Sequence, residues 1–270
     1  MNLFYRKYGE GPPFIILHGL FGSSDNWMSI GKILSERFMV FLIDIRNHGN
    51  SPHSEEFNYT LLKNDILDFM LAQNIDKAII MGHSMGGKAA MFFAADYPEK
   101  VQSLIIVDIS PGSYLSIDKP SPQSLDHMNI LTAMLGVNLP KVKNREEVDK
   151  LLAPAIKSER IRRFLLKNIK RDHDNKFSWK LNVQALHDNL PKIMEGLDTN
   201  KFIKGNGVTG FPILFVKGEQ SDYINNENLP LIKIIFPTAN IVTIPGAGHW
   251  VHAEQPELFI KTINDFLGIA

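Results

Sequence analysis

The sequence predicts an α/β protein with a mostly parallel central sheet and helices on both of its faces. Short apolar runs alternate along the chain with amphipathic stretches, which is the pattern of strands and helices in such a sheet. Each run ends in a polar or glycine-rich turn. The chain has 270 residues, 44% of them hydrophobic and 21% charged, so it can bury the core that this architecture needs.

Five apolar runs stand out as strands, and a sixth follows them. Each is four or five residues long and is bounded by turn residues. The six runs are residues 14–17, 39–43, 77–81, 103–107, 213–216 and 240–244. Ligands bind beyond the carboxyl ends of the strands in an open α/β sheet, so we expect the chemistry in the turns that follow these runs.

A long stretch between the fourth and fifth runs shows little strand signal. Residues 161–169 and 183–190 have the mixed amphipathic character of helices. The predicted division is a core of residues 1–110 and 205–270 and a helical cap of residues 111–204. Because such a cap would be inserted at the carboxyl edge of the sheet, we expect it to cover a pocket there. Its basic stretch, residues 157–171, is interpreted as a solvated helix face in preference to a patch for anionic substrates.

Composition excludes several classes of function. The 29 Lys and Arg residues balance the 29 Asp and Glu residues, so nucleic acid is not an expected partner. The absence of cysteine excludes disulfides, thiolate metal sites and cysteine nucleophiles. The longest wholly apolar run, residues 89–95, is too short to span a membrane, and the first residues do not resemble a secretory signal. We therefore expect a cytoplasmic protein, a monomer or a homodimer.

A Gly-His-Ser-Met-Gly motif at residues 82–86 carries the chemistry. The apolar run before it and the alanine-rich stretch after it predict a strand, a sharp turn and a helix in that order, which holds the serine in a strained conformation with its hydroxyl exposed. This context favours Ser84 as a nucleophile over a structural serine. The same turn directs the Met85 N–H to the place where an oxyanion would form.

A serine needs a base, and nine histidines are available. His249 is the best candidate, because it lies in a glycine-rich loop after the last apolar run. Four other histidines near turns are interpreted as structural or as rim residues, namely His18, His48, His83 and His252. The turn at residues 44–51 is interpreted as scaffold.

The acid that orients the base remains open between two aspartates. Asp108 ends the run that should neighbour the strand before Ser84, and Asp222 follows the fifth run. Both give the chain order serine, acid, histidine that this type of site uses. Glu219 is a third and weaker candidate.

A second oxyanion donor is expected in the turn after the first run. Leu20 N–H is our choice there, with Phe21 N–H as the alternative. The side chains of Phe21 and Trp250 are predicted to line the substrate pocket.

Several motifs together resemble the α/β-hydrolase superfamily, and more closely its YbfF-type esterases. They are His-Gly-Leu-Phe-Gly-Ser at 18–23, Asp-Ile-Arg-Asn-His-Gly at 44–49, the serine motif and its continuation at 82–88, Val-Asp-Ile-Ser-Pro at 107–111, and residues 246–256. The resemblance implies hydrolysis of carboxylic esters or thioesters without cofactor or metal, with Ser84 as nucleophile and His249 as base. Where many members of the superfamily have their acid, this chain has Ser221, and the YbfF-type pattern favours Asp108 over Asp222.

The predicted function is therefore that of a serine hydrolase acting on a small-molecule ester or thioester through an acyl-enzyme. Two alternatives stay open, because a fold does not fix a reaction. One is a cofactor-free carbon–carbon hydrolase or lyase that uses the same residues. The other is a ligand sensor without enzymatic activity.

Overall fold

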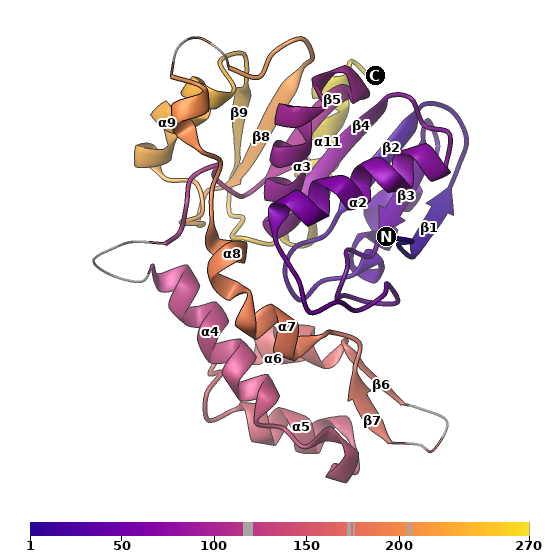
Figure 1. Cartoon of the computed structure of the whole chain (residues 1–270), viewed down its shortest axis with the longest axis vertical. Coiled ribbons are helices and arrows are strands. Elements are labelled where there is room, and N and C mark those ends of the chain that lie inside the picture. The colour runs from indigo at the N-terminus through magenta and orange to yellow at the C-terminus, as the bar shows by residue number, and fades with distance from the viewer. Residues whose placement is uncertain (116–120, 172–173, 175, 204, 206, 270) are drawn as a thin grey trace.

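The computed structural model describes residues 1–115, 121–171, 174, 176–203, 205 and 207–269. It consists of a sheet covered by helices and of a smaller lobe that projects from one end of that sheet (Figure 1). The chain leaves the sheet after its fifth strand, builds the smaller lobe, and returns to add two more strands. We call this lobe the cap.

The central sheet has seven strands in the described part of the chain, in the order β1-β3-β2-β4-β5-β8-β9. Their bounds are β1 Tyr5–Tyr8, β2 Pro13–Leu17, β3 Met39–Ile43, β4 Ala78–His83, β5 Val101–Val107, β8 Ile213–Gly218 and β9 Asn240–Ile244. All neighbours are parallel except β1, which pairs antiparallel with β3. All six predicted strands are confirmed to within two residues at each end, whereas β1 was not predicted.

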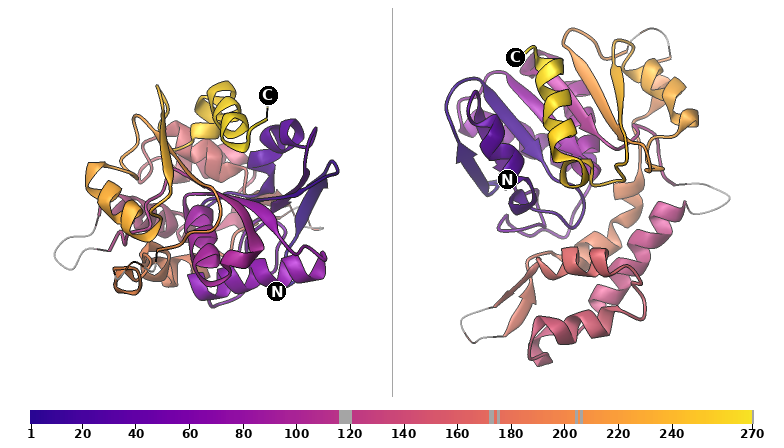
Figure 2. Two further views of the ribbon diagram at one scale, coloured as in Figure 1. Left: turned by 90° about the horizontal axis from the view of Figure 1, so that it is seen from above. Right: turned by 180° about the vertical axis from the view of Figure 1, so that it is seen from behind.

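Helices cover both faces of the sheet because strand residues alternate between two hydrophobic cores. In β2, for example, Ile15 and Leu17 pack into one core while Phe14 and Ile16 pack into the other. The first core is shared with α2 Tyr59–Ala72, α3 Met85–Asp96 and α9 Leu229–Ile235, and the second with α1 Met28–Leu34 and α11 Pro256–Leu267. Figure 2 shows α11 and α2 on opposite sides of the sheet.

The cap contains five helices and a small hairpin among its described residues. The helices are α4 Pro122–Leu135, α5 Arg145–Leu152, α6 Glu159–Leu166, α7 Val183–Asp188 and α8 Leu190–Met194, and the hairpin pairs β6 Ile169–Arg171 with β7 Phe177–Trp179. The predicted fold class is confirmed. The predicted helix over residues 161–169 is wrong at its end, because α6 stops at Leu166 and Ile169 starts a strand. The exact division into core and cap stays a prediction.

Two short segments connect the cap to the core, and we call them the neck. They are residues 111–114 on the way out and residues 193–197 on the way back. Backbone hydrogen bonds join them, from Tyr114 N–H to the Met194 carbonyl at 2.8 Å and from Leu197 N–H to the Pro111 carbonyl at 2.9 Å. A Cβ on Gly196 would lie 2.3 Å from the Gly112 carbonyl carbon, so the two segments are in close contact.

Candidate active site

Ser84 lies at a sharp turn between β4 and α3. Its backbone has φ +52° and ψ −123°, a conformation that residues other than glycine rarely adopt. The flanking glycines make this turn possible. A Cβ on Gly82 would lie 2.2 Å from the Gly86 carbonyl oxygen, and one on Gly86 would lie 2.5 Å from the carbonyl oxygens of Leu17 and His18. Strand and helix therefore approach each other more closely than any side chain would allow.

Asp108 follows β5, which is the neighbour of β4 in the sheet, as predicted. The residue is fully buried and, like Ser84, has a positive φ, here +51°. Three groups donate hydrogen bonds to its carboxylate. Oδ2 accepts from His249 Nδ1 at 2.7 Å and from the Ser221 hydroxyl, and Oδ1 accepts from Gly218 N–H at 2.9 Å. These contacts fix the orientation of the carboxylate toward His249.

His249 lies in the loop between β9 and α10 Val251–Glu254. An ionised carboxylate can only accept hydrogen bonds, so Nδ1 carries the proton and Nε2 keeps a lone pair that can accept another. The ring stacks on Tyr223 with 3.9 Å between centroids and lies 4.6 Å from the ring of His83. His83 Nε2 donates to the His249 carbonyl at 2.8 Å, which holds the loop against β4. Burial lowers the pKa of His83 well below its usual value.

The rival acids lie elsewhere. Asp222 is exposed and lines a separate cavity of about 200 Å³ together with Ser110 and Asn225. Glu219 accepts a hydrogen bond from Gly246 N–H at 2.9 Å. Among the described residues, neither carboxylate is hydrogen-bonded to His249. The geometry thus favours Asp108 as the partner of the histidine.

The turn predicted to supply the second oxyanion donor lies against Ser84. A Cβ on Gly19 would be 3.0 Å from the Ser84 Cβ. The N–H groups of Leu20 and Met85 have no hydrogen-bond partner within the described residues, and both residues line the cavity that contains Ser84. Free N–H groups on both sides of a nucleophile are the arrangement that stabilises a tetrahedral oxyanion.

The cavity at Ser84 is small. Its lining comes from the core, the neck and α4, and consists of Leu20, Tyr59, Ser84, Met85, Lys88, Ile109, Tyr114, His127, Ile193, Met194 and Tyr223. Its volume of about 10 Å³ is roughly the space of one water molecule. The Ser84 hydroxyl makes no hydrogen bond to any described residue, His249 included. Contacts between catalytic groups often tighten only when substrate binds.

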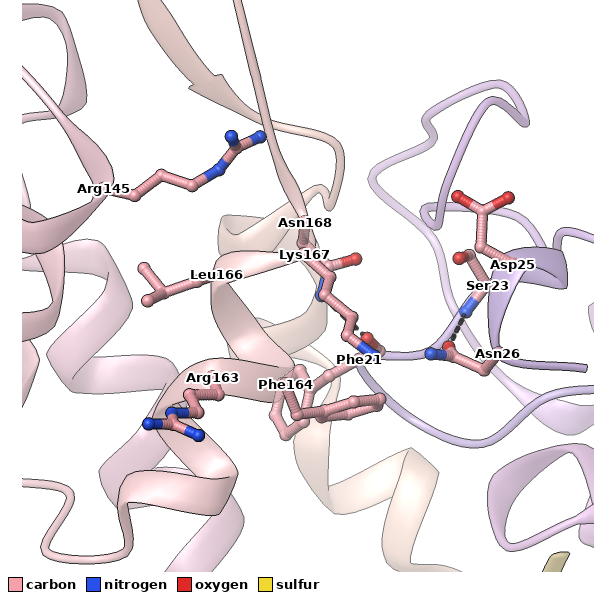
Figure 3. A pocket seen from close by; sticks show the side chains of 10 residues that line it. All are labelled: Phe21, Ser23, Asp25, Asn26, Arg145, Arg163, Phe164, Leu166, Lys167 and Asn168. Atoms are coloured by element: carbon pink, nitrogen blue, oxygen red, sulfur yellow. Dashed lines mark hydrogen bonds between the residues drawn. The ribbon is translucent and has the colours of Figure 1, made fainter. Parts of the chain in front are cut away.

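The two residues predicted to line the substrate pocket lie at the junction of cap and core. Phe21 lines a larger cavity of about 410 Å³, where the Asn168 amide donates to its carbonyl at 2.8 Å (Figure 3). Trp250 packs against the cap, with the Arg160 guanidinium 4.5 Å from its ring centroid and the ring of Phe164 at 5.6 Å. Neither is part of the lining of the Ser84 cavity, so their contact with substrate stays a prediction.

Comparison with known proteins shows the family. The chain matches the α/β hydrolase fold family over residues 12–256. It belongs to that family. Similar proteins include esterase YbfF of Escherichia coli, 32% identical over 94% of this chain and 92% of that protein. An sn-1-specific diacylglycerol lipase of Mus musculus is 36% identical over 95% of this chain and 81% of that protein. A solved structure titled marine microorganism esterase is 46% identical, covers 98% of both chains and has a TM-score of 0.91.

These relatives confirm two predictions about this α/β hydrolase. The resemblance to YbfF-type esterases is confirmed by a relative of that name and by the extent of the match. The prediction that the chain is an esterase is confirmed by esterases that are similar over nearly the full length.

Sequence reasoning missed several residues of the hydrolase's site. Ser221 was noted only as the occupant of a position where relatives have an acid, but its hydroxyl donates to Asp108. Tyr223 supports the His249 ring, and its hydroxyl lies 3.2 Å from Nε2 of His127, a residue of α4. Lys88 was part of a quoted motif without any role, although it lines the Ser84 cavity. No spacing rule connects these residues, since they come from different elements.

The histidines interpreted as structural do have structural contacts in this hydrolase. His18 Nε2 accepts from Ile45 N–H at 3.0 Å, and His48 Nδ1 lies 2.9 Å from the Arg46 carbonyl. His252 stacks on Trp27 with 3.9 Å between centroids. In the turn interpreted as scaffold, Asp44 accepts from the N–H groups of Ser24 and Asn50.

The described residues hold neither a metal-binding cluster nor a membrane-spanning helix. They contain no group of three or more histidines, aspartates or glutamates placed to hold a metal ion. None of their helices has both the length and the apolar character that crossing a bilayer requires.

Proposed function

We propose that this α/β hydrolase cleaves small-molecule carboxylic esters or thioesters through an acyl-enzyme on Ser84, with His249 as base and Asp108 as the acid that orients it. The observation that supports this most strongly is the 2.7 Å hydrogen bond between His249 Nδ1 and the buried carboxylate of Asp108. The imidazole also stacks on Tyr223, which lines the same cavity as Ser84. Ser84 follows β4, Asp108 follows the neighbouring strand β5, and His249 follows β9, so all three lie at the carboxyl edge of the sheet.

The first half of the reaction acylates the serine. The Ser84 oxygen attacks the carbonyl carbon of the substrate while its proton passes to Nε2 of His249. The negative charge that develops on the carbonyl oxygen is held by the N–H groups of Met85 and Leu20. The bond to the leaving alcohol or thiol then breaks, and that group takes the proton from His249.

The second half releases the acid. Water attacks the acyl-enzyme, His249 accepts its proton, and Ser84 leaves with that proton as the carboxylic acid forms. The imidazole is cationic in both halves, so the carboxylate of Asp108 stabilises it twice in each cycle. Every proton and electron pair is carried by these residues, the substrate and water, so the cycle needs no cofactor.

The names of the relatives support the class of substrate. Esterase and diacylglycerol lipase activities both cleave the ester bond between an acyl group and an alcohol, and they belong to proteins that are similar to this chain over nearly its whole length. We propose the same bond as the target here.

The experiment is a kcat/KM measurement on p-nitrophenyl butyrate for the wild type and for Ser84→Ala and His249→Ala. Loss of either group should reduce kcat by about 10⁴-fold or more. Stoichiometric labelling of the wild type, but not of Ser84→Ala, by a fluorophosphonate would identify the nucleophile. No turnover of esters of any acyl length by the wild type would contradict the proposal and favour the lyase or sensor alternatives.

A further inference from the structure

Lys88 is a buried lysine one helical turn after Ser84. Only 1% of it is exposed, and it lines the Ser84 cavity. Its Nζ donates to the carbonyl of Met194 at 3.3 Å and to the carbonyl of Glu195, and it lies 4.6 Å from the ring centroid of Tyr114. None of the ion pairs between described side chains includes it. Because its side chain is buried, the pKa of Lys88 is lowered to about 7, although the negative charge of Glu195 acts in the opposite direction.

The two carbonyls that Lys88 contacts belong to the neck of the cap. A second side chain of the core is hydrogen-bonded to the same segment. The Tyr59 hydroxyl donates to the Ile193 carbonyl at 2.7 Å. The returning segment is therefore held by α2 and by α3, the helix that begins beside Ser84. Since the outgoing segment is bonded to the returning one, both segments are fixed together.

The neck is also a wall of the catalytic cavity. Ile193 and Met194, whose carbonyls are held by Tyr59 and Lys88, belong to the lining around Ser84. With about 10 Å³ of free space, the cavity accepts an acyl chain only if part of this lining moves. A buried amino group, charged or neutral, that loses its hydrogen-bond acceptors costs free energy, so Lys88 opposes movement of this wall.

We propose that Lys88 is a positioning residue that fixes the neck against the nucleophile helix and thereby limits the length of the acyl group that Ser84 accepts. The proposal rests on the proposed function, in which Ser84 carries the acyl group. Lys88 contacts neither the reacting atoms nor His249. Its effect on specificity passes through the wall formed by Ile193 and Met194.

The test compares Lys88→Met, which removes the donors but keeps most of the volume, with Lys63→Met as a matched control. Lys63 also bridges elements, since it pairs with Asp96 between α2 and α3, but it lies outside the neck and the cavity. Tyr59→Phe is a second, milder variant, because it removes only the hydroxyl that holds the Ile193 carbonyl.

Two measurements report on the neck and on specificity separately. Hydrogen exchange of the Tyr114 and Leu197 amides, which join the two neck segments, should become about tenfold faster in Lys88→Met, and faster by a smaller factor in Tyr59→Phe. The ratio of kcat/KM for p-nitrophenyl octanoate to that for the butyrate should rise about tenfold in Lys88→Met. Lys63→Met should change neither, and amides of β4 should exchange as in the wild type in all three variants.

Unchanged exchange at Tyr114 and Leu197, or an unchanged acyl-length ratio, in a folded Lys88→Met would overturn the proposal. If Lys88→Met does not fold, Tyr59→Phe decides by the same two criteria. If the wild type hydrolyses no ester, the proposed function fails while the exchange measurement still decides whether Lys88 fixes the neck.

Discussion

Asp108 and His249 are joined by a 2.7 Å hydrogen bond although 141 residues separate them in the chain. The carboxylate is fully buried and receives two further hydrogen bonds, so it has one orientation available. Asp222, which has the same order in the sequence relative to Ser84 and His249, is exposed and bonds neither of them within the described residues. The two aspartates therefore differ in their contact with His249.

Asp108→Asn should reduce kcat on p-nitrophenyl butyrate by about 10⁴-fold. The amide would present an N–H to Nδ1 and stabilise the wrong tautomer of His249, in which Nε2 carries the proton and cannot accept the one from Ser84. Asp222→Asn is the matched control and should keep wild-type activity, because its carboxylate is exposed. A collapse of kcat at Asp222 with survival at Asp108 would reassign the acid.

Ser221→Ala should reduce kcat by about tenfold and leave KM nearly unchanged. The hydroxyl donates to the same carboxylate oxygen that binds His249, so it helps to hold the acid in place. The loss is smaller than for Asp108→Asn, since the contact with Gly218 N–H remains. Steady-state kinetics on the same ester measure it, and a kcat equal to that of the wild type would show that this hydroxyl does not support the acid.

Gly86→Ala should destabilise the fold by about 1–3 kcal/mol. The new Cβ would lie 2.5 Å from two backbone carbonyl oxygens of β2 and the turn after it, and backbone atoms in a central strand cannot move away cheaply. Gly136→Ala is the control, because its φ is −69° and its nearest neighbour is 3.4 Å away, so the substitution should be neutral or slightly stabilising. Urea unfolding of both variants measures the difference, and equal stabilities would contradict the steric argument.

Stability should fall as the pH drops from about 6.5 toward 4, because five histidines, His83 among them, are buried with a lowered pKa. Burial lowers the pKa of His18 and His127 to about 4 and that of His48 and His252 to about 3. In this window the unfolded chain binds protons that the folded chain does not, so each histidine removes at most about 1.4 kcal/mol of stability per pH unit, with the steepest loss in the middle of the window.

The pH dependence is checked by urea unfolding at several pH values. His252→Phe keeps a ring to stack on Trp27 but removes one titrating group, so its stability should fall less steeply with decreasing pH. His53→Gln is the control, since His53 is exposed, and should keep the slope of the wild type. A slope in His252→Phe equal to that of the wild type would mean that His252 is not kept neutral by the fold.

The sequence predicted the parts of the fold whose signals are local. Five of the six predicted strands are mostly buried and are continuous apolar runs, and the sixth, β9, lies at the edge but keeps three apolar residues, Ile241, Val242 and Ile244, so all six were found. The edge strand β1, Tyr-Arg-Lys-Tyr, pairs on one side only and is half-polar, and it was missed. The hairpin β6–β7 was missed because its strands have only three residues and β6 falls in a basic stretch.

Residues of the candidate site could be predicted where they are adjacent in the sequence. They could not be predicted where segments distant in the sequence come together in the fold. Ser84 and its glycines form one continuous motif. Asp108 and Asp222 could not be separated by chain order, and their distance to His249 depends on how β5 and β8 are placed in the sheet. His127 and the neck reach the cavity from the cap, whose packing on the core leaves no periodic mark in the sequence.

Asn168 forms a contact between the cap and the turn that carries Leu20. Asn168 is 3% exposed and donates through its side-chain amide to the carbonyl of Phe21, a residue with φ +63° (Figure 3). Asn168→Ala would leave this carbonyl without its donor and loosen the turn. The Leu20 N–H is proposed to act on the oxyanion, which exists only in the transition state and intermediates, so kcat should fall about tenfold with little change in KM.

Asn182 offers a matched control for Asn168. It also belongs to the cap and bonds a core loop, through contacts with the Ser54 carbonyl at 3.2 Å and with Asn47, but that loop is not the one that carries Leu20. Asn182→Ala removes a comparable contact between cap and core, so it should leave kcat close to that of the wild type. Equal losses of kcat in both variants would mean that any loosening of the cap slows the reaction. A loss confined to Asn168→Ala would assign the effect to the turn at Leu20.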